Sequence, residues 1–168
     1  MIPVPARRCG SVRSEVTMIE SLKIKELRVI PDERGRLMEI MRSDDEIFEN
    51  FGQVYMSATY PGVVKGWHMH LKQADNICCV HGMLKLVVYD GREGSPTKGR
   101  IDEFFIGEHN PLVVHIPPRL YHGWICVSEH EALVVNIPTE PYDHANPDEH
   151  RLPAHGSEIP YDWRRKDG

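Results

Sequence analysis

The sequence predicts an all-β protein whose strands form a two-sheet barrel, and three observations lead to this fold class. From Ile24 onward, short runs rich in valine, isoleucine and aromatic residues are separated by glycine, proline, aspartate and asparagine, which is typical of strands joined by turns. Ten such runs follow one another, a number that suits two stacked sheets. The 168 residues also suffice for a single domain with a substantial hydrophobic core.

The expected strands follow the chain from Glu26 to Ile137. They are Glu26–Val29, Arg36–Arg42, Gln53–Thr59, Val63–Met69, Ile77–Val80, Met83–Tyr89, Ile101–Ile106, Leu112–Ile116, Trp124–Val127 and Ala132–Ile137. One short helix is expected at Asp44–Phe51, because Ser43 can cap its first turn and two aspartates would complement the helix dipole. The barrel as a whole is expected to cover residues 23–140.

The two ends of the chain are expected to lie outside the barrel. Residues 1–22 are expected to form a short N-terminal arm, in which no apolar run follows Arg7 and Arg8, so a signal peptide is not predicted. Met18 is a candidate start of the natural chain. After Pro138 the sequence is rich in proline, histidine and acidic residues, and residues 141–168 are expected to be an irregular C-terminal extension that packs on the barrel.

Composition and charge exclude several classes of protein. Apolar runs fall far short of the roughly 18 residues that a membrane span needs. Twenty basic against 25 acidic residues give a net charge of -5, and no basic block is present, so nucleic acid is not an expected partner. The four cysteines have no disulfide-like spacing, which favours a reduced, cytoplasmic protein.

Two histidines have a spacing that suits a metal site. His68 and His70 lie two apart on an expected strand, so both side chains point to one face. Asp75 and His122 follow as a carboxylate and a third imidazole. This donor set suits Zn, Fe, Ni, Cu or Mn. The alternative is that the histidines are hydrogen-bonding residues of a metal-free barrel interior.

The order of these residues resembles the two sequence motifs of the cupin superfamily. The matching positions are Gly62, His68, His70, Asp75 and Gly82 in the first motif, and Pro117, Arg119 and His122 in the second. The resemblance implies a double-stranded β-helix, or jelly-roll barrel. It also implies a divalent metal held by His68, His70, Asp75 and His122, with a second arrangement in which Asp75 only supports three histidine ligands.

The segment 32–142 further resembles one cupin branch, the dTDP-4-dehydrorhamnose 3,5-epimerases and their nucleotide-sugar isomerase relatives. The matching segments are Asp32–Gly35 with Glu39, Gln53–Ser57, Lys65–His68, Val88–Arg92, Ser95–Thr97 and Pro117–Trp124. The resemblance implies a nucleotide-sugar substrate, a homodimer and no organic cofactor.

The same resemblance implies roles for individual residues. His68 matches the base that removes a proton beside the sugar's 4-keto group, and Lys65 matches a cation that faces the developing oxyanion. His122 would line the same cavity. The positions that would contact the substrate are Arg34 and Glu39, from the neighbouring subunit, and Gln53 within the cavity.

Other positions depart from this branch. Asn136 stands where the catalytic tyrosine is expected, which leaves Tyr142 as the nearest phenol and the predicted acid. Gly156 stands where an aspartate would orient the base, and the two metal-like residues His70 and Asp75 replace other family residues. We therefore predict altered chemistry that uses a bound divalent metal.

Three functions fit these residues. The first is a metal-assisted epimerase or isomerase of a dTDP-4-keto-6-deoxysugar type of substrate. The second is a metal-dependent cupin oxygenase or lyase that acts on a small substrate. The third is a non-catalytic sugar-binding cupin, which the missing tyrosine and aspartate favour.

Overall fold

The structure is a computed structural model that describes residues 18–166, and its regular elements are strands. In chain order they are β1 (Lys23–Glu26), β2 (Val29–Asp32), β3 (Gly35–Met38), β4 (Tyr55–Thr59), β5 (Val64–Met69), β6 (Asp75–His81), β7 (Met83–Tyr89), β8 (Ile101–Gly107), β9 (Leu112–Ile116), β10 (Tyr121–Cys126), β11 (Ala132–Asn136) and β12 (His150–Arg151). Residues 1–17 of the predicted N-terminal arm lie outside the described part.

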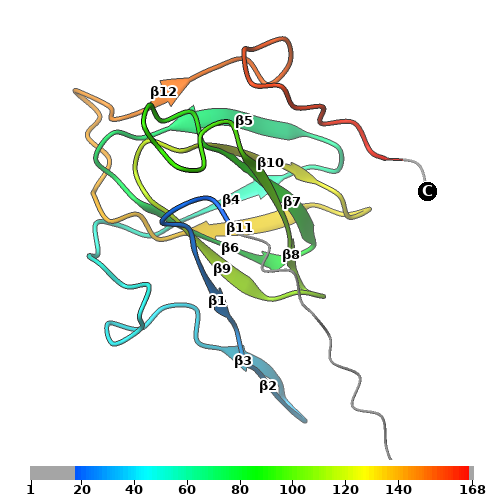
Figure 1. The fold of residues 1–168 in the computed structure, drawn as a ribbon. Helices are drawn as coiled ribbons and strands as arrows, with labels where there is room; N and C mark the ends of the chain where they lie inside the picture. The colour runs from blue at the N-terminus through cyan, green and yellow to red at the C-terminus, as the bar shows by residue number, and fades with distance from the viewer. Residues whose placement is uncertain (1–17, 167–168) are drawn as a thin grey trace, which may run out of the picture.

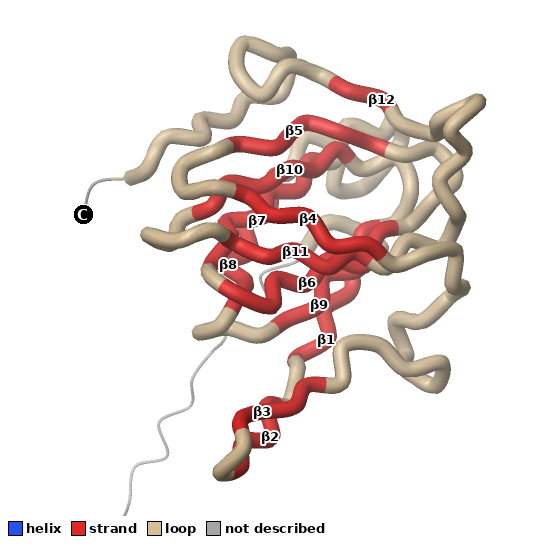
Figure 2. Tube along the Cα trace, turned by 180° about the vertical axis from the view of Figure 1, so that it is seen from behind, coloured by secondary structure: helices blue, strands red, loops and turns tan. Residues whose placement is uncertain are grey.

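Two five-stranded antiparallel sheets face each other and form the barrel (Figures 1 and 2). The first sheet has the order β1-β9-β6-β11-β4, and the second has the order β12-β5-β10-β7-β8. Consecutive strands such as β5 and β6 belong to different sheets, as in a jelly roll. The predicted all-β jelly-roll fold is confirmed. Within residues 18–166, no helix is long and apolar enough to cross a bilayer.

The main core fills the space between the two sheets. Alternate residues of the strands point inward, and Ile77, Leu84, Leu86 and Val114 are fully buried there. A separate cluster lies on the second sheet, where Trp163 and other C-terminal residues pack on it. The C-terminal segment thus covers this sheet and runs beside β12 and β5 in Figure 1.

The predicted helix at Asp44–Phe51 is wrong, since residues 43–47 form turns and residues 48–51 are irregular. The Asp45 carboxylate accepts the backbone N–H of Arg42 and the ammonium of Lys25, at 2.7 and 2.5 Å. A segment this short gains too few helical hydrogen bonds to offset the cost of nucleation, so these contacts set a compact turn instead.

The predicted strand Glu26–Val29 is also wrong, because it covers the link between two strands. Leu27 is buried in the core and donates its N–H to the Pro111 carbonyl, while β2 starts only at Val29. The other predicted strands are found as β3–β11 with ends shifted by a few residues, and β1, β2 and β12 were not predicted.

The hairpin of β2 and β3 projects away from the barrel (Figure 1). It exposes apolar side chains, with Ile30 at 43% and Leu37 at 58% exposure. Its tip carries Arg34, whose guanidinium pairs only with Asp32 among the described residues. An apolar surface held out in this way is typical of a contact with another chain.

Candidate active site

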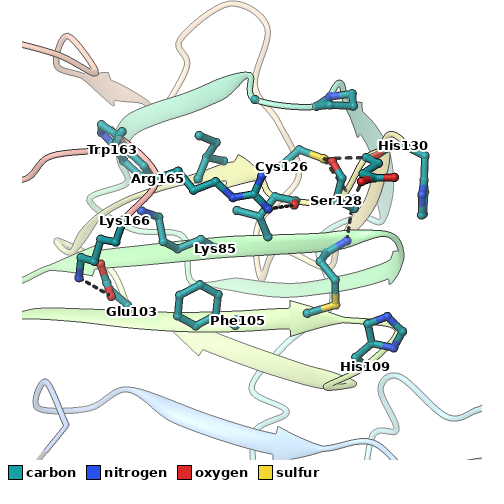
Figure 3. A pocket seen from close by; sticks show the side chains of 16 residues that line it. Lys85, Glu103, Phe105, His109, Cys126, Ser128, His130, Trp163, Arg165 and Lys166 are labelled. Carbon is teal, nitrogen blue, oxygen red and sulfur yellow. Dashed lines mark hydrogen bonds and ion pairs between the residues drawn. The ribbon is translucent and has the colours of Figure 1, made fainter. Parts of the chain in front are cut away.

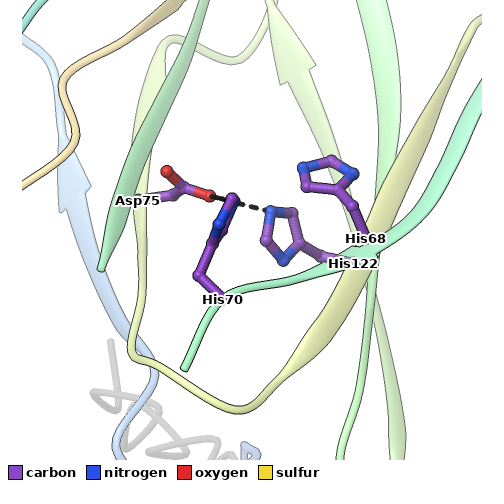
Figure 4. Close-up of side chains that lie close together, drawn as sticks. All are labelled: His68, His70, Asp75 and His122. Carbon is purple, nitrogen blue, oxygen red and sulfur yellow. Dashed lines mark ion pairs between the residues drawn. The ribbon is translucent and has the colours of Figure 1, made fainter. Parts of the chain in front are cut away.

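Four side chains from both sheets meet inside one end of the barrel (Figure 4). His68 lies on β5 and His122 lies opposite it on β10, while Asp75 opens β6 in the first sheet. His70 follows the end of β5 and turns back toward them. One possible ligand atom from each of the four lies within 4.8 Å of the others. The grouping predicted from the sequence is therefore found in the fold.

Asp75 is held so that one of its oxygens faces the histidines. Its Oδ1 accepts N–H groups from the amides of Gln73 and Asn136, both at 2.8 Å. Its Oδ2 is buried and has no hydrogen bond among the described residues, although it lies 3.0 Å from His122 Nε2 and 3.4 Å from His70 Nε2. Burial acts to raise the pKa of Asp75, but the two facing imidazoles outweigh it and hold the pKa well below its usual range.

The outer nitrogens of the two histidines fix their tautomers. Nδ1 of His70 bonds to the carbonyl of Asp148, and Nδ1 of His122 bonds to the carbonyl of Leu120 at 3.1 Å. A carbonyl can only accept, so Nδ1 carries the hydrogen in both rings, and Nε2 of each ring faces Asp75 as an acceptor when the ring is neutral and as a donor when the ring is protonated.

When both rings are neutral, three acceptor atoms converge in this buried space, and a positive charge between them relieves their repulsion. One source is a proton on His70: burial acts to lower its pKa, but the Asp75 carboxylate outweighs this and raises it. The other source is a metal ion, since ligating histidines usually donate their second N–H to a carbonyl or carboxylate. The donor set fits a divalent transition metal.

His68 stands at the side of this group and is only partly buried, so a ligand can reach it. Its ring lies 4.0 Å from the ring of His122 and 5.6 Å from that of Trp124, measured between centroids. Burial, together with the neighbouring His122, holds the pKa of His68 well below its usual value. The ring is therefore neutral near pH 7 and can accept a proton.

Lys65, Gln53 and Tyr142 lie on other parts of the barrel wall. The Lys65 ammonium donates to Ser57 Oγ at 3.0 Å and to the Ala58 carbonyl at 2.7 Å, which joins β5 to β4. Gln53 Oε1 accepts the backbone N–H of Tyr142 at 3.3 Å. The Tyr142 side chain is 42% exposed, and among the described residues it makes no hydrogen bond with any of the four converging residues.

Arg34 and Glu39 lie on and beside the projecting hairpin. Their ion pairs are local, from Arg34 to Asp32 at 2.6 Å and from Glu39 to Arg42 at 3.2 Å. Within the described residues of one chain, neither contacts the converging group. The resemblance to the epimerase branch implies that both residues contact the substrate bound by the neighbouring subunit.

A family model described as dTDP-4-dehydrorhamnose 3,5-epimerase matches residues 16–167 of this chain. The chain belongs to this family. Its resemblance to the epimerase branch is thereby confirmed, and the protein is a cupin of the dTDP-sugar epimerase and isomerase type.

Two curated relatives match along nearly their whole length. The chain is 44% identical over 147 residues to the probable low-salt glycan biosynthesis epimerase Agl13 of Haloferax volcanii, which covers 86% of this chain and 94% of that protein. It is 38% identical over 146 residues to the spore coat polysaccharide biosynthesis protein SpsL of Bacillus subtilis, with 87% and 97% covered.

Solved structures show the same fold. A dTDP sugar isomerase from Desulfovibrio desulfuricans superposes with a TM-score of 0.83 at 33% identity, over 89% of this chain and 94% of that one. The epimerase RmlC from Legionella pneumophila, solved in complex with dTDP-4-keto-L-rhamnose, gives a TM-score of 0.77 at 27% identity, with 88% and 80% covered.

Sequence reasoning gave no site role to Tyr55 and no supporting role to Asn136. Asn136, where the resemblance implies a tyrosine in the family, is 3% exposed and connects three groups. Its Oδ1 accepts the N–H of Asn76 at 3.0 Å, and its Nδ2 donates to Asp75 Oδ1 at 2.8 Å and to Tyr55 Oη at 3.0 Å. The alternation of the predicted strand Gln53–Thr59 could have revealed Tyr55, because it shares a face with Ser57 and Thr59.

A separate cavity of about 940 Å³ lies on the second sheet beside the C-terminal segment (Figure 3). Its lining includes Phe105, Lys85, Arg165 and Lys166. None of the residues predicted as catalytic, substrate-binding or metal-binding lines it. The group of residues that the sequence predicts as the site lies inside the barrel instead.

Proposed function

We propose that the protein is an epimerase or isomerase that moves a proton beside the keto group of a dTDP-4-keto-6-deoxysugar or a closely similar nucleotide sugar. The observation that carries this proposal is His68, a neutral and accessible imidazole inside the barrel of a chain that belongs to the dTDP-sugar epimerase family. The bound sugar nucleotide of the similar Legionella enzyme supports the substrate class.

His68 would act as the base. A C–H bond next to a ketone is acidic because the electron pair can move onto the carbonyl oxygen, and a neutral imidazole within reach accepts the proton. The enolate oxygen then needs a positive partner. Lys65 is the proposed one: two of its three N–H donors are used by Ser57 and Ala58, which leaves one for the substrate.

A divalent metal at the converging group is a further part of this proposal. His70 Nε2, His122 Nε2 and Asp75 Oδ2 would hold it, with His68 beside them as a fourth possible ligand. The support is the convergence of three acceptors whose outer atoms are fixed by carbonyls and amides. A bound ion of the Zn, Fe, Mn, Ni or Cu type would supply a Lewis acid that polarises the keto oxygen.

We propose that the protein works as a homodimer in which hairpins are exchanged. The exposed Ile30 and Leu37 would be covered by the partner. The hairpin would carry Arg34 and Glu39 to the nucleotide in the partner's barrel, which explains why both lack contact with the site of their own chain. The free, buried Cys78, Cys79 and Cys126 support a reducing, cytoplasmic setting.

Solvent exchange tests the proposed reaction. Incubation of the wild type with dTDP-4-keto-6-deoxyglucose in D2O should place deuterium on the carbon next to the ketone, as read by mass spectrometry. His68→Ala should reduce the exchange by about 100-fold or more, whereas His155→Ala, at an exposed position, serves as the matched control. Wild-type protein that exchanges no deuterium with such sugars would contradict the proposal.

The second candidate function is a metal-dependent oxygenase or lyase that acts on a small substrate. Two imidazoles and one carboxylate on one ion favour it, since non-haem iron oxygenases use this set. Elemental mass spectrometry of protein purified without chelators separates the candidates. Stoichiometric iron or copper together with oxygen uptake would favour the oxygenase, and a metal-free protein that binds sugar nucleotides without reaction would favour a binding role.

A further inference from the structure

The family's tyrosine position holds Asn136, so a proton donor has to come from elsewhere. We propose that Tyr55 is the catalytic acid, which delivers a proton to the substrate carbon from the side opposite His68. This inference rests on the proposed epimerase or isomerase function. It names the residue that returns a proton to the substrate carbon after His68 has removed one.

The hydroxyl of Tyr55 is oriented for donation. Tyr55 pairs with Asn136 across β4 and β11, and the Asn136 amide donates to Tyr55 Oη at 3.0 Å. Because Oη accepts this bond, its own hydrogen is left for another acceptor, and none is found among the described residues. The residue is 42% exposed, so a ligand at the mouth of the barrel can contact the phenol.

The electrostatic setting keeps this phenol protonated. Burial raises the pKa of Tyr55, and the negative charges of Asp75 and Glu149 act in the same direction, against the lowering effect of the Asn136 bond. A phenol that holds its proton at neutral pH is a donor throughout the working range.

Tyr55 and His68 are the two ends of one continuous arc of side chains. From Tyr55 the contacts run to Asn136 at 3.0 Å, to Asp75 at 2.8 Å and to His122 at 3.0 Å, and the His122 ring lies 4.0 Å from that of His68. Tyr55 belongs to the first sheet and His68 to the second. A sugar ring held between the ends of the arc would therefore meet base and acid on different faces, which inversion of a carbon centre requires.

The proton steps balance. His68 takes the proton from the carbon next to the ketone, and the C–H electron pair moves to the keto oxygen to give an enolate. When the carbonyl re-forms, the carbon takes the Tyr55 proton on its other face, and a phenolate and an imidazolium remain. Water then carries the proton from His68 to Tyr55, which restores both groups.

The inference is tested by measuring two products separately, the deuterium gained by the recovered substrate and the amount of epimer formed. The wild type, Tyr55→Phe and the control Tyr60→Phe, at a phenol that is 70% exposed, are incubated with dTDP-4-keto-6-deoxyglucose in D2O. In Tyr55→Phe, the recovered substrate should still gain deuterium through His68, whereas epimer formation should fall about 100-fold or more. Tyr55→Gln, which keeps an acceptor for Asn136, should show the same loss.

Three results would overturn the assignment. One is epimer formation that survives in Tyr55→Phe or Tyr55→Gln. Another is an equal loss of exchange and epimer in both variants, which would indicate a structural role. The third is a selective loss of epimer in Tyr142→Phe instead. A wild type that exchanges no deuterium would overturn the proposed function itself, so the two failures are distinguishable.

Discussion

Replacing Asp75 with asparagine should separate the metal affinity of the barrel from its folding. The new side chain keeps Oδ1 as the acceptor of the Gln73 and Asn136 amides. It also replaces the unbonded Oδ2 with an NH₂ group that can donate to Nε2 of His122, 3.0 Å away. Without metal, Asp75→Asn loses the attraction between the carboxylate and the imidazoles that holds the pKa of Asp75 low, so we expect the variant to fold with a lower free energy of unfolding than the wild type.

With metal, the same substitution removes the only anionic ligand of the converging set. Replacing a residue that only supports a metal ligand typically lowers the metal affinity 10–100-fold. For the replacement of a ligand itself we therefore take a loss of about 100-fold. At a metal concentration of about 100 times the wild-type Kd, binding stabilises the wild type by about 2.7 kcal/mol. For the variant this concentration equals Kd, and the stabilisation is about 0.4 kcal/mol.

The difference of about 2.3 kcal/mol corresponds to roughly 5–9 °C in Tm for a chain of this length. Thermal unfolding of chelator-treated protein with added Zn²⁺ or Mn²⁺ measures it. Glu108→Gln is the matched control, because Glu108 lies between His81 and His130 in a second, more exposed group of possible ligands. Equal metal-induced shifts in the wild type and Asp75→Asn, or a shift lost only in Glu108→Gln, would refute the reasoning.

Three further predictions concern the dimer and the fold. Mixing inactive Arg34→Ala with inactive His68→Ala, followed by subunit exchange, should restore about one quarter of the wild-type sites, because half of the dimers then hold one intact site; no recovery would exclude a shared site. Trp163→Ala should lower the free energy of unfolding by about 3–5 kcal/mol in urea titrations, since Trp163 is 1% exposed and packs on Trp67. The pKa of Asp90 is depressed: burial raises it, but bonds from Arg92, Ser95 and Thr97 prevail. Its contribution to stability is thus present above about pH 4 and lost below, so the stability gap between the wild type and Asp90→Asn should narrow as the pH falls from 7 to 3.

The converging group could be predicted because the signal that starts it, the spacing of two histidines, lies within one strand. The two-residue spacing of His68 and His70 places both on one face of a strand, whatever the strand pairs with. Asp75 and His122 then followed from the order of the motifs, and the fold followed from the short alternating runs. These signals depend on neighbouring residues and survive small errors in the strand ends.

Alternation along the predicted strand could put Tyr55 on the same face as Ser57 and Thr59. It could not put Tyr55 beside Asn136, because that contact depends on register between distant strands. Its pairing with Asn136 joins residues that are 81 positions apart, and a slip of one residue would point the phenol to the other face. The sequence predicted Tyr142 as the acid because it is the nearest tyrosine along the chain, and chain order carries no information on strand register. The predicted helix at Asp44–Phe51 failed for a related reason, since tertiary contacts of Asp45 decided the turn.

Asn136 shows how one substitution can be absorbed by its surroundings. An asparagine at the expected tyrosine position supplies no acidic proton, yet its amide has two hydrogens, and they bond to Asp75 on one side and Tyr55 on the other. The first bond leaves only Oδ2 of Asp75 facing the histidines. The second orients a phenol from the next strand. Asn136→Tyr should therefore not restore the usual family chemistry, because it removes both bonds and crowds the position that Tyr55 already occupies. We expect this variant to lose both metal-induced stabilisation and epimer formation, and a gain in epimer formation would contradict the coupling of Asn136 to both groups.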